Sequence, residues 1–150
     1  MQPLTITLSH AASAFRLEIA NASQSPVRIW SAEFSLGYDS VYFRVSAHDG
    51  RECFIRRKPA IWSANVPEFV SIQPGRNHAL RIDVNDGTWV LKHCRIEPRT
   101  KIEIAAVLEI PDDEISKELA VTTGRYESNN LEFGSIDEIV NRDGGGVNDG

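Results

Sequence analysis

Residues 15–19 read Phe-Arg-Leu-Glu-Ile, and residues 4–8 read Leu-Thr-Ile-Thr-Leu. In both stretches an apolar side chain alternates with a polar one. Successive side chains of a β-strand point to opposite faces, so this period of two gives each strand one apolar and one polar face. The same alternation returns in residues 80–84 and 101–104. The chain is therefore predicted to form antiparallel sheets that bury one face and expose the other.

Turn-forming residues separate these runs, for example at 21–26, 48–50, 73–75 and 85–87. Gly, Pro, Asn, Asp and Ser favour the backbone conformations of tight turns. Short strands separated by such turns are typical of a β-sandwich. We predict one all-β domain over residues 1–140, an immunoglobulin-like antiparallel β-sandwich of about seven to nine strands. The predicted strands are 3–8, 14–20, 27–34, 40–47, 52–57, 68–72, 78–84, 100–110 and 118–126.

Helical spacing of apolar residues is confined to two short stretches, 112–120 and 135–141, so helix is predicted only as short turns. The chain ends, over residues 141–150, in Asn-Arg-Asp-Gly-Gly-Gly-Val-Asn-Asp-Gly. This segment has almost no apolar side chain to bury, so it cannot offset the conformational entropy lost on ordering. We predict a disordered tail there.

The composition limits the classes of partner. The 150-residue chain has a formal net charge of −5, with 41% hydrophobic and 25% charged residues. Nucleic acids and anionic membranes favour basic surfaces, so neither is predicted as a partner. No apolar stretch approaches the roughly 20 residues of a membrane span, and the first residues do not form a secretory leader. We therefore predict a cytoplasmic protein.

The two cysteines, Cys53 and Cys94, lie inside strand-like segments. Without a visible leader, they are predicted to be free thiols in a reducing compartment. A disulfide between them requires that their strands be neighbours.

Several stretches share a strand–turn–strand order with Asp-Gly and Pro-Gly turns. The stretches are Phe15–Asn21, followed by Ser25, Pro26 and Val27; Val41–Val45, leading into Asp49 and Gly50; and Ser71–Gly75, before another alternating strand.

This order, over residues 15–84, resembles the intracellular proteinase-inhibitor domain of the BsuPI type. The resemblance implies an immunoglobulin-like sandwich and an inhibitory activity. The chain departs from the family in lacking a Trp-Ser pair after Asp49 and Gly50, in its long insert at 56–69 and in its C-terminal extension. The resemblance therefore supports the fold more than the activity.

The sequence lacks the common catalytic and metal-binding motifs. None of the histidines (His10, His48, His78 and His93) has another His within four residues, and only His93 adjoins a cysteine, Cys94. Adjacent strand residues point to opposite faces, so that pair does not grip one ion. CxxC, HxxxH, HExxH, GxSxG and glycine-rich phosphate loops are absent from the sequence. No metal, no cofactor and no enzyme activity are predicted.

The acidic residues Asp112, Asp113 and Glu114 follow Pro111 directly after a predicted strand. Such a cluster could hold a cation or act as paired carboxylates. Acidic side chains also favour the positive end of a helix dipole. The start of a short helix is the preferred interpretation.

The segment 56–69 joins two predicted strands and is too long for a hairpin turn. It contains Arg56, Arg57 and Trp62, and Arg and Trp are enriched in interface hot spots. We predict a non-catalytic protein-binding module that contacts another protein through this loop or through an edge strand. An intracellular inhibitor, or an immunity-type protein that neutralises a basic toxin, is the sharpest form of this prediction.

Two alternatives stay open. Trp62 and Ile61 can instead fold back and close the end of the sandwich, since large apolar side chains are usually buried. The domain can also bind a small molecule or a carbohydrate, with Trp62, Trp89 and Tyr38 as stacking platforms. Trp30 and Trp89 lie in or beside predicted strands, which favours a core position for both.

Overall fold

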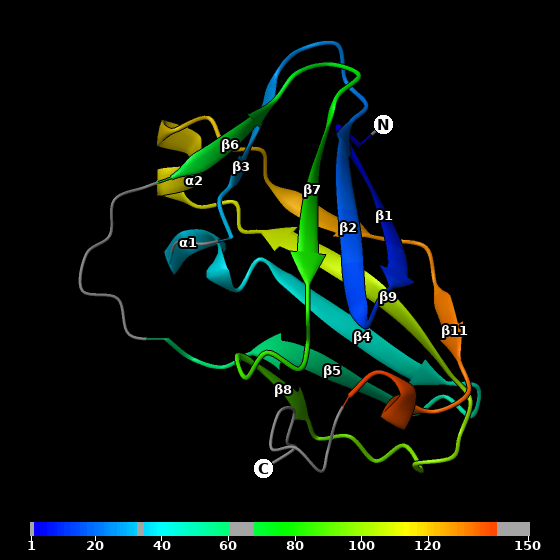
Figure 1. Cartoon of the computed structure of the whole chain (residues 1–150). Helices are drawn as coiled ribbons and strands as arrows, with labels where there is room; N and C mark the ends of the chain where they lie inside the picture. Colours follow the sequence, from blue (N-terminus) through cyan, green and yellow to red (C-terminus); the bar gives the residue numbers. More distant parts are fainter. Residues whose placement is uncertain (1, 33–34, 61–67, 141–150) are drawn as a thin grey trace.

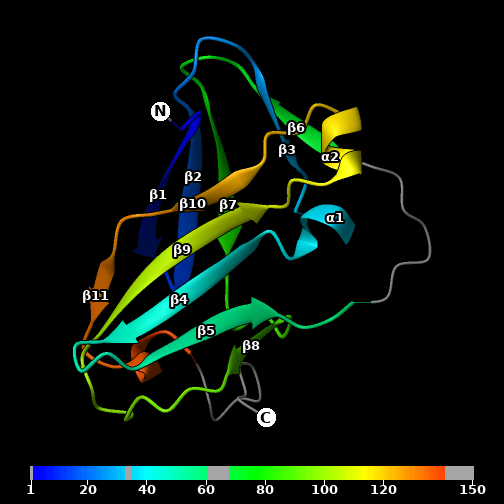
Figure 2. The same cartoon turned by 180° about the vertical axis from the view of Figure 1, so that it is seen from behind.

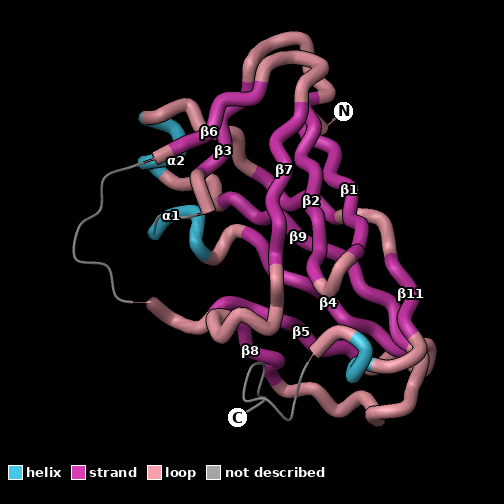
Figure 3. The backbone as a smooth tube through the Cα atoms, in the orientation of Figure 1, coloured by secondary structure: helices cyan, strands magenta, loops and turns pink. Residues whose placement is uncertain are grey.

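The structure, a computed structural model, describes residues 2–32, 35–60 and 68–140. Over these residues the chain is mostly β, as predicted, and its helices are short turns (Figures 1 and 3). The described residues contain eleven strands, more than the seven to nine predicted. The strands are β1 (Leu4–Ala11), β2 (Ala14–Asn21), β3 (Val27–Trp30), β4 (Val41–Ala47), β5 (Glu52–Arg57), β6 (Phe69–Ile72), β7 (Asn77–Ile82), β8 (Trp89–Lys92), β9 (Ile102–Ile110), β10 (Gly124–Glu127) and β11 (Leu131–Phe133); the helical turns are α1 (Ser35–Tyr38), α2 (Glu114–Glu118) and the 3-10 turn η1 (Ile136–Glu138).

The strands form two layers and a short ribbon. The larger layer is a six-stranded sheet of order β10-β9-β4-β5-β8, in which β11 also pairs with β9 (Figure 2). The smaller layer is the three-stranded sheet β1-β2-β7, and β3 pairs with β6 in the ribbon. Every strand pairing in the described ranges is antiparallel. The strands of the smaller layer run across β4 and β9, so the two sheets face each other in a sandwich-like arrangement (Figure 1).

The hydrophobic core lies between the two layers. The Phe15 ring of β2 lies 4.9 Å from the Phe43 ring of β4, measured between centroids. The Phe43 ring in turn lies 5.6 Å from the Trp89 ring of β8. Trp89 is 2% exposed and Trp30 is 4% exposed, so the core positions predicted for both are confirmed. Tilted aromatic pairs of this kind add to the stabilisation that burial alone provides.

The predicted strands differ from the observed ones chiefly at their ends. Each of the predicted strands overlaps an observed strand, but the segment 118–126 begins too early, because β10 starts only at Gly124 after α2. The sequence does not predict β8 and β11, which have only 4 and 3 residues. In β8 the outward-facing Val90 is apolar, so the period of two is absent there.

A buried asparagine fixes a bend shared by two strands. The ribbon β3–β6 continues the ladder β2–β7 beyond this bend (Figure 1). Asn21, 3% exposed, lies at the end of β2. Its Nδ2 donates to the carbonyls of Ser25 and Ile72, both at 2.8 Å, and its Oδ1 accepts from N and Oγ of Ser23 at 2.8 and 2.7 Å. The amide therefore uses its full hydrogen-bonding capacity to tie the turn to the end of β6.

A second asparagine closes one side of the sandwich. Leu8, on the edge strand β1, donates its N–H to Asn129 Oδ1 at 2.8 Å and accepts from Asn129 Nδ2 at 3.0 Å. Asn129 lies between β10 and β11, next to Ser128. Ser128 in turn bonds β9, since its N–H donates to the Ala106 carbonyl at 2.9 Å and its Oγ accepts from the Ala106 N–H at 2.8 Å. These two side chains thus link the edge of one sheet to the other sheet.

We expect Asn21→Ala to lower the free energy of unfolding by about 2–3 kcal/mol, because it removes the buried hydrogen bond to the Ile72 carbonyl together with the bonds to Ser23 and Ser25 that hold the turn. Asn130→Ala is the matched control, since Asn130 is exposed, and it should change stability by less than about 0.5 kcal/mol. Urea denaturation of both variants measures the difference. Equal stabilities would mean that Asn21 does not fix the bend.

Candidate functional site

Two consecutive arginines at the end of β5 point to opposite faces of the larger sheet. Arg56 is exposed on the outer face, and its Cζ lies 3.8 Å from the centroid of the Tyr42 ring and 5.5 Å from that of the Phe54 ring. The Tyr42 hydroxyl donates to Glu109 at 3.1 Å, which holds the ring in place. Arg56 therefore rests on a fixed aromatic platform and loses little freedom on binding.

Arg57 points between the layers. Its Cζ lies 4.5 Å from the centroid of the Tyr38 ring and 5.2 Å from that of the Trp89 ring. Its Nη1 donates to the Ala32 carbonyl at 3.0 Å. Its buried Nε has no hydrogen-bond partner among the described residues. Arg57 is thus half-buried and packs beside α1 at the end of β5.

The structure places two of the three predicted contact residues. Trp62 and Ile61 lie outside the described residues, so the alternative that they close the end of the sandwich stays a prediction. Trp89 is 2% exposed and offers no free ring face for a sugar. Tyr38 is half-buried and carries Arg57 against its ring. Two of the three aromatic rings predicted to stack on a sugar, those of Trp89 and Tyr38, are therefore already packed against other residues.

The surface is hollowed on both sides of the ridge formed by Arg56, Arg57 and Pro59. These three residues line both hollows. One hollow, of about 320 Å³, is also lined by Asp39, Val41 and Tyr42, and the other, of about 440 Å³, by Glu52, Cys53, Phe54, Lys92 and His93.

Around this ridge the basic side chains Arg56, Arg57, Lys58 and Lys92 outnumber the acidic Asp39, Glu52 and Glu109, although the whole chain carries a net charge of −5. Lys58 and Lys92 are exposed beside Arg56, and none of the three forms an ion pair in the part of the chain that the structure describes. The nearby Glu52 pairs with Arg44 at 3.6 Å, which partly neutralises it. The ridge can therefore attract an acidic group.

A disulfide joins Cys53 to Cys94, so the prediction of free thiols is wrong. The sequence does not predict β8, and this strand brings the two residues together. β8 pairs with β5, with Phe54 opposite Lys92, and the two cysteine Cα atoms lie 4.8 Å apart. That separation is within the range that a disulfide requires.

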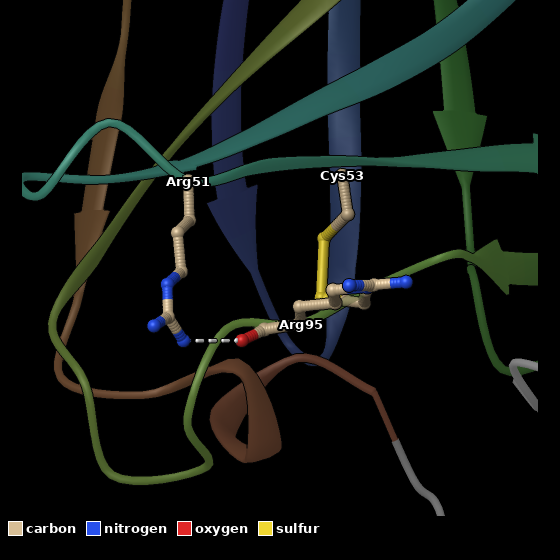
Figure 4. The surroundings of a disulfide bond; sticks show 4 residues. Arg51, Cys53 and Arg95 are labelled. Carbon is tan, nitrogen blue, oxygen red and sulfur yellow. Dashed lines mark hydrogen bonds between the residues drawn. A yellow bond between two sulfur atoms is a disulfide. The ribbon is translucent and has the colours of Figure 1, made fainter.

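A hydrogen bond lies beside the disulfide and links the same two segments. Arg51, which directly precedes β5, donates from Nη1 to the Arg95 carbonyl at 2.9 Å (Figure 4). The disulfide and this bond together fix the loop that follows β8 against the edge of the larger sheet.

The acidic cluster begins a helix, as predicted. Asp113 is the N-cap of α2, and its Oδ1 accepts from the Ser116 N–H at 2.9 Å. This hydrogen bond lowers the pKa of Asp113 below its ordinary value of 3.8. Across residues 2–32, 35–60 and 68–140, no three His, Cys, Asp or Glu side chains gather as metal ligands would.

None of the helices in the described residues is long and apolar enough to cross a membrane. No protein-family model, no curated protein and no solved structure matches this chain. Function is therefore inferred from the residues themselves.

Alkylation tests the disulfide. Denatured protein purified without reductant should take up no iodoacetamide, and reduced protein should be labelled at both Cys53 and Cys94, as intact mass spectrometry would report. The double variant Cys53→Ala/Cys94→Ala should lose about 2–4 kcal/mol of stability relative to the oxidised protein. Labelling at both positions without reductant would restore the free-thiol prediction.

The cap of α2 should make stability depend on pH. Because the folded-state pKa of Asp113 lies below its ordinary value of 3.8, the cap contributes fully above that pH and is lost as the pH falls through the folded-state pKa. Asp113→Ala should therefore lower Tm at pH 7, and the difference from wild type should shrink below about pH 4. The control is Asp112→Ala, which removes only an exposed ion pair with Lys117. A Tm difference that stays constant with pH would exclude this role for Asp113.

Proposed function

We propose that this protein is a non-catalytic protein-binding module whose contact surface is centred on Arg56. We call this the Arg56 surface, and it consists of Phe54, Arg56, Lys58, Pro59 and Lys92. The observation that carries the proposal is the exposed guanidinium of Arg56 stacked at 3.8 Å on the Tyr42 ring between two hollows. Arginine and aromatic side chains are the groups that most often anchor protein interfaces.

The surface favours a partner that presents carboxylates. Arg56, Lys58 and Lys92 carry positive charge without ion-pair partners in the described ranges. Complementary charge speeds association, whereas like charges placed opposite each other disfavour it. An acidic face on the partner therefore fits this surface. A basic toxin does not fit it, so we do not retain that form of the immunity prediction here.

The resemblance of residues 15–84 to the BsuPI-type inhibitor family supplies the most specific form of the proposal. In this form the antiparallel sheets have the immunoglobulin-like topology, and the module inhibits a proteinase. The Arg56 surface lies where β5 runs into the insert at 56–69, which is the segment that departs from that family. We therefore expect the insert to select a different partner from those of other family members.

The Cys53–Cys94 disulfide gives information on the redox state of the cellular compartment in which the protein resides. Disulfides persist in oxidising environments and are rare in the cytosol. The bond therefore supports an oxidising compartment rather than the cytoplasmic location predicted from the sequence.

The Arg56 surface is tested by affinity capture with the wild-type protein as bait on extracts of the source cells. We expect one protein to be retained in stoichiometric amount, and Arg56→Ala to bind it about 10–30-fold more weakly, as the loss of a hot-spot side chain implies. Isothermal titration with the purified partner measures that change.

Arg99→Ala is the matched control, because Arg99 is exposed and lies outside the Arg56 surface. Both variants should melt within about 2 °C of wild type, as exposed substitutions usually do. Arg57→Ala is unsuitable as a binding test, since it removes a side chain that packs on Trp89 and should lower Tm. Equal affinity of wild type and Arg56→Ala for the partner would exclude the Arg56 surface as the contact.

A further inference from the structure

The two layers of the sandwich have four edges, and three of them are protected within the described residues. The β1 edge is bonded at Leu8 by the Asn129 side chain. The β10–β11 edge is interrupted between the strands, which have only 4 and 3 residues. The β8 edge has only 4 residues. Interruptions and short length are among the usual ways of blocking an exposed edge.

The fourth edge, β7, is six residues long and pairs only with β2 in the described part of the chain. The direction of its backbone groups follows from the neighbouring ladder. Leu8 turns its N–H and C=O toward Asn129, away from β2. Backbone groups alternate along a strand, so Thr7 faces β2, where it lies opposite Glu18. The backbone N–H and C=O groups of Glu18 therefore face β1, and those of the adjacent Leu17 face β7.

Leu17 lies opposite Leu80, so the backbone groups of Leu80 face β2. The N–H and C=O groups of Asn77, Ala79 and Arg81 then point away from the sheet. A second hydrogen bond agrees with this alternation. The Asn21 N–H donates to the Arg76 carbonyl at 3.0 Å, so Arg76, like Leu80, turns its carbonyl toward β2. The β7 edge thus presents alternating donors and acceptors along its length.

The β7 edge is also basic. Residues 73–82 include Arg76 and Arg81 and contain no Asp or Glu. Both arginines are exposed, and neither forms an ion pair within residues 2–32, 35–60 and 68–140. Arg81 lies directly opposite Arg16 on the outer face of the sheet. Arg16 is paired with Glu18 at 3.1 Å, so Arg81 is the arginine of the two that is left to attract an acidic side chain added beside β7.

The two faces of β7 differ. On the inner face, Leu80 and His78 are only half-buried, and Leu80 packs against the core. A strand added beside β7 would cover these side chains with its own inward-facing residues. Its outward-facing residues would lie beside Arg81.

We propose that β7 binds an extended segment of a partner protein by strand addition, and that this segment alternates acidic residues with apolar ones. The proposal rests on the proposed function only in taking a protein as the partner, and it uses a different surface. Main-chain hydrogen bonds to Asn77, Ala79 and Arg81 supply affinity, and the alternation of side chains supplies specificity. A second copy of this chain is disfavoured as the occupant, because its β7 would bring Arg76 and Arg81 of both molecules to one edge.

The test uses a short fluorescein-labelled peptide in which Glu alternates with Val, and the same peptide with Lys in place of Glu. Fluorescence anisotropy should show that the acidic peptide binds at least about tenfold more tightly than the basic one. Amide chemical shifts of Asn77, Ala79 and Arg81 should move on titration.

Ala79→Pro removes the outward N–H, and a proline is tolerated at an edge position that faces solvent. It should weaken binding of the acidic peptide at least about tenfold, the effect of losing one hydrogen bond together with its geometry. Ala79→Thr is the matched control, since it keeps the N–H and suits a strand, and it should bind as wild type. Arg81→Glu leaves the backbone intact and should reverse the preference between the two peptides.

The proposal is overturned if wild type binds neither peptide, if it binds both equally, or if Ala79→Pro and Arg81→Glu bind the acidic peptide as wild type does. A wild-type dimer in sedimentation that Ala79→Pro dissociates would make a second copy the occupant and would also overturn it. Arg56→Ala should bind the peptide normally. If it does not, the peptide occupies the Arg56 surface, so strand addition at β7 fails while the proposed function stands.

Discussion

The contact between Phe15 and Phe43 is the interaction on which the rest of the structure depends. Each sheet has one apolar face, and a sheet of a few strands is not stable until that face is covered. The two rings, 4.9 Å apart, are where the two layers meet. From Phe43 the packing continues to Trp89, and the Trp89 ring supports the guanidinium of Arg57. Because Arg57 is held inside, its neighbour Arg56 is directed to the outer face. The candidate site is therefore positioned by the core.

Two polar side chains fix features of the sandwich that packing of the core does not determine. Asn21 fixes the bend of the smaller layer, and Asn129 bonds one of its edges to the larger layer. Both act as substitutes for backbone, because an amide side chain offers the same donor and acceptor as a peptide group. On the opposite edge, β7, no described side chain plays this part. Within the described residues, the sandwich is thus closed along its β1 side, whereas its β7 side pairs with no further strand.

The sequence predicts the parts of the fold that depend on local pattern. The alternation in residues 4–8 and 15–19 is sufficient to predict β1, β2 and the burial of one face, because strand periodicity is a local property. The disulfide is not predictable in this way, since it depends on the pairing of β8 with β5, and β8 has no polar alternation. The sequence singles out Arg56 and Arg57 as candidate contact residues, but their different surroundings depend on which face each occupies at the end of β5. That assignment needs the strand boundary, which local pattern leaves uncertain by a few residues.

The bond between Leu8 and Asn129 has a consequence for synthesis of the chain, because 121 positions separate the two residues. A ribosome adding about 5–20 residues per second needs on the order of 6–24 s to pass from one to the other. During that interval the first hairpin, β1 and β2, has no second layer to cover its apolar face and no cap on its outer edge. Nascent hairpins in this state attract other unfinished chains. A chaperone that binds nascent chains at the ribosome exit tunnel would therefore benefit this protein most while only the first hairpin has been synthesised, well before the Arg56 surface has formed.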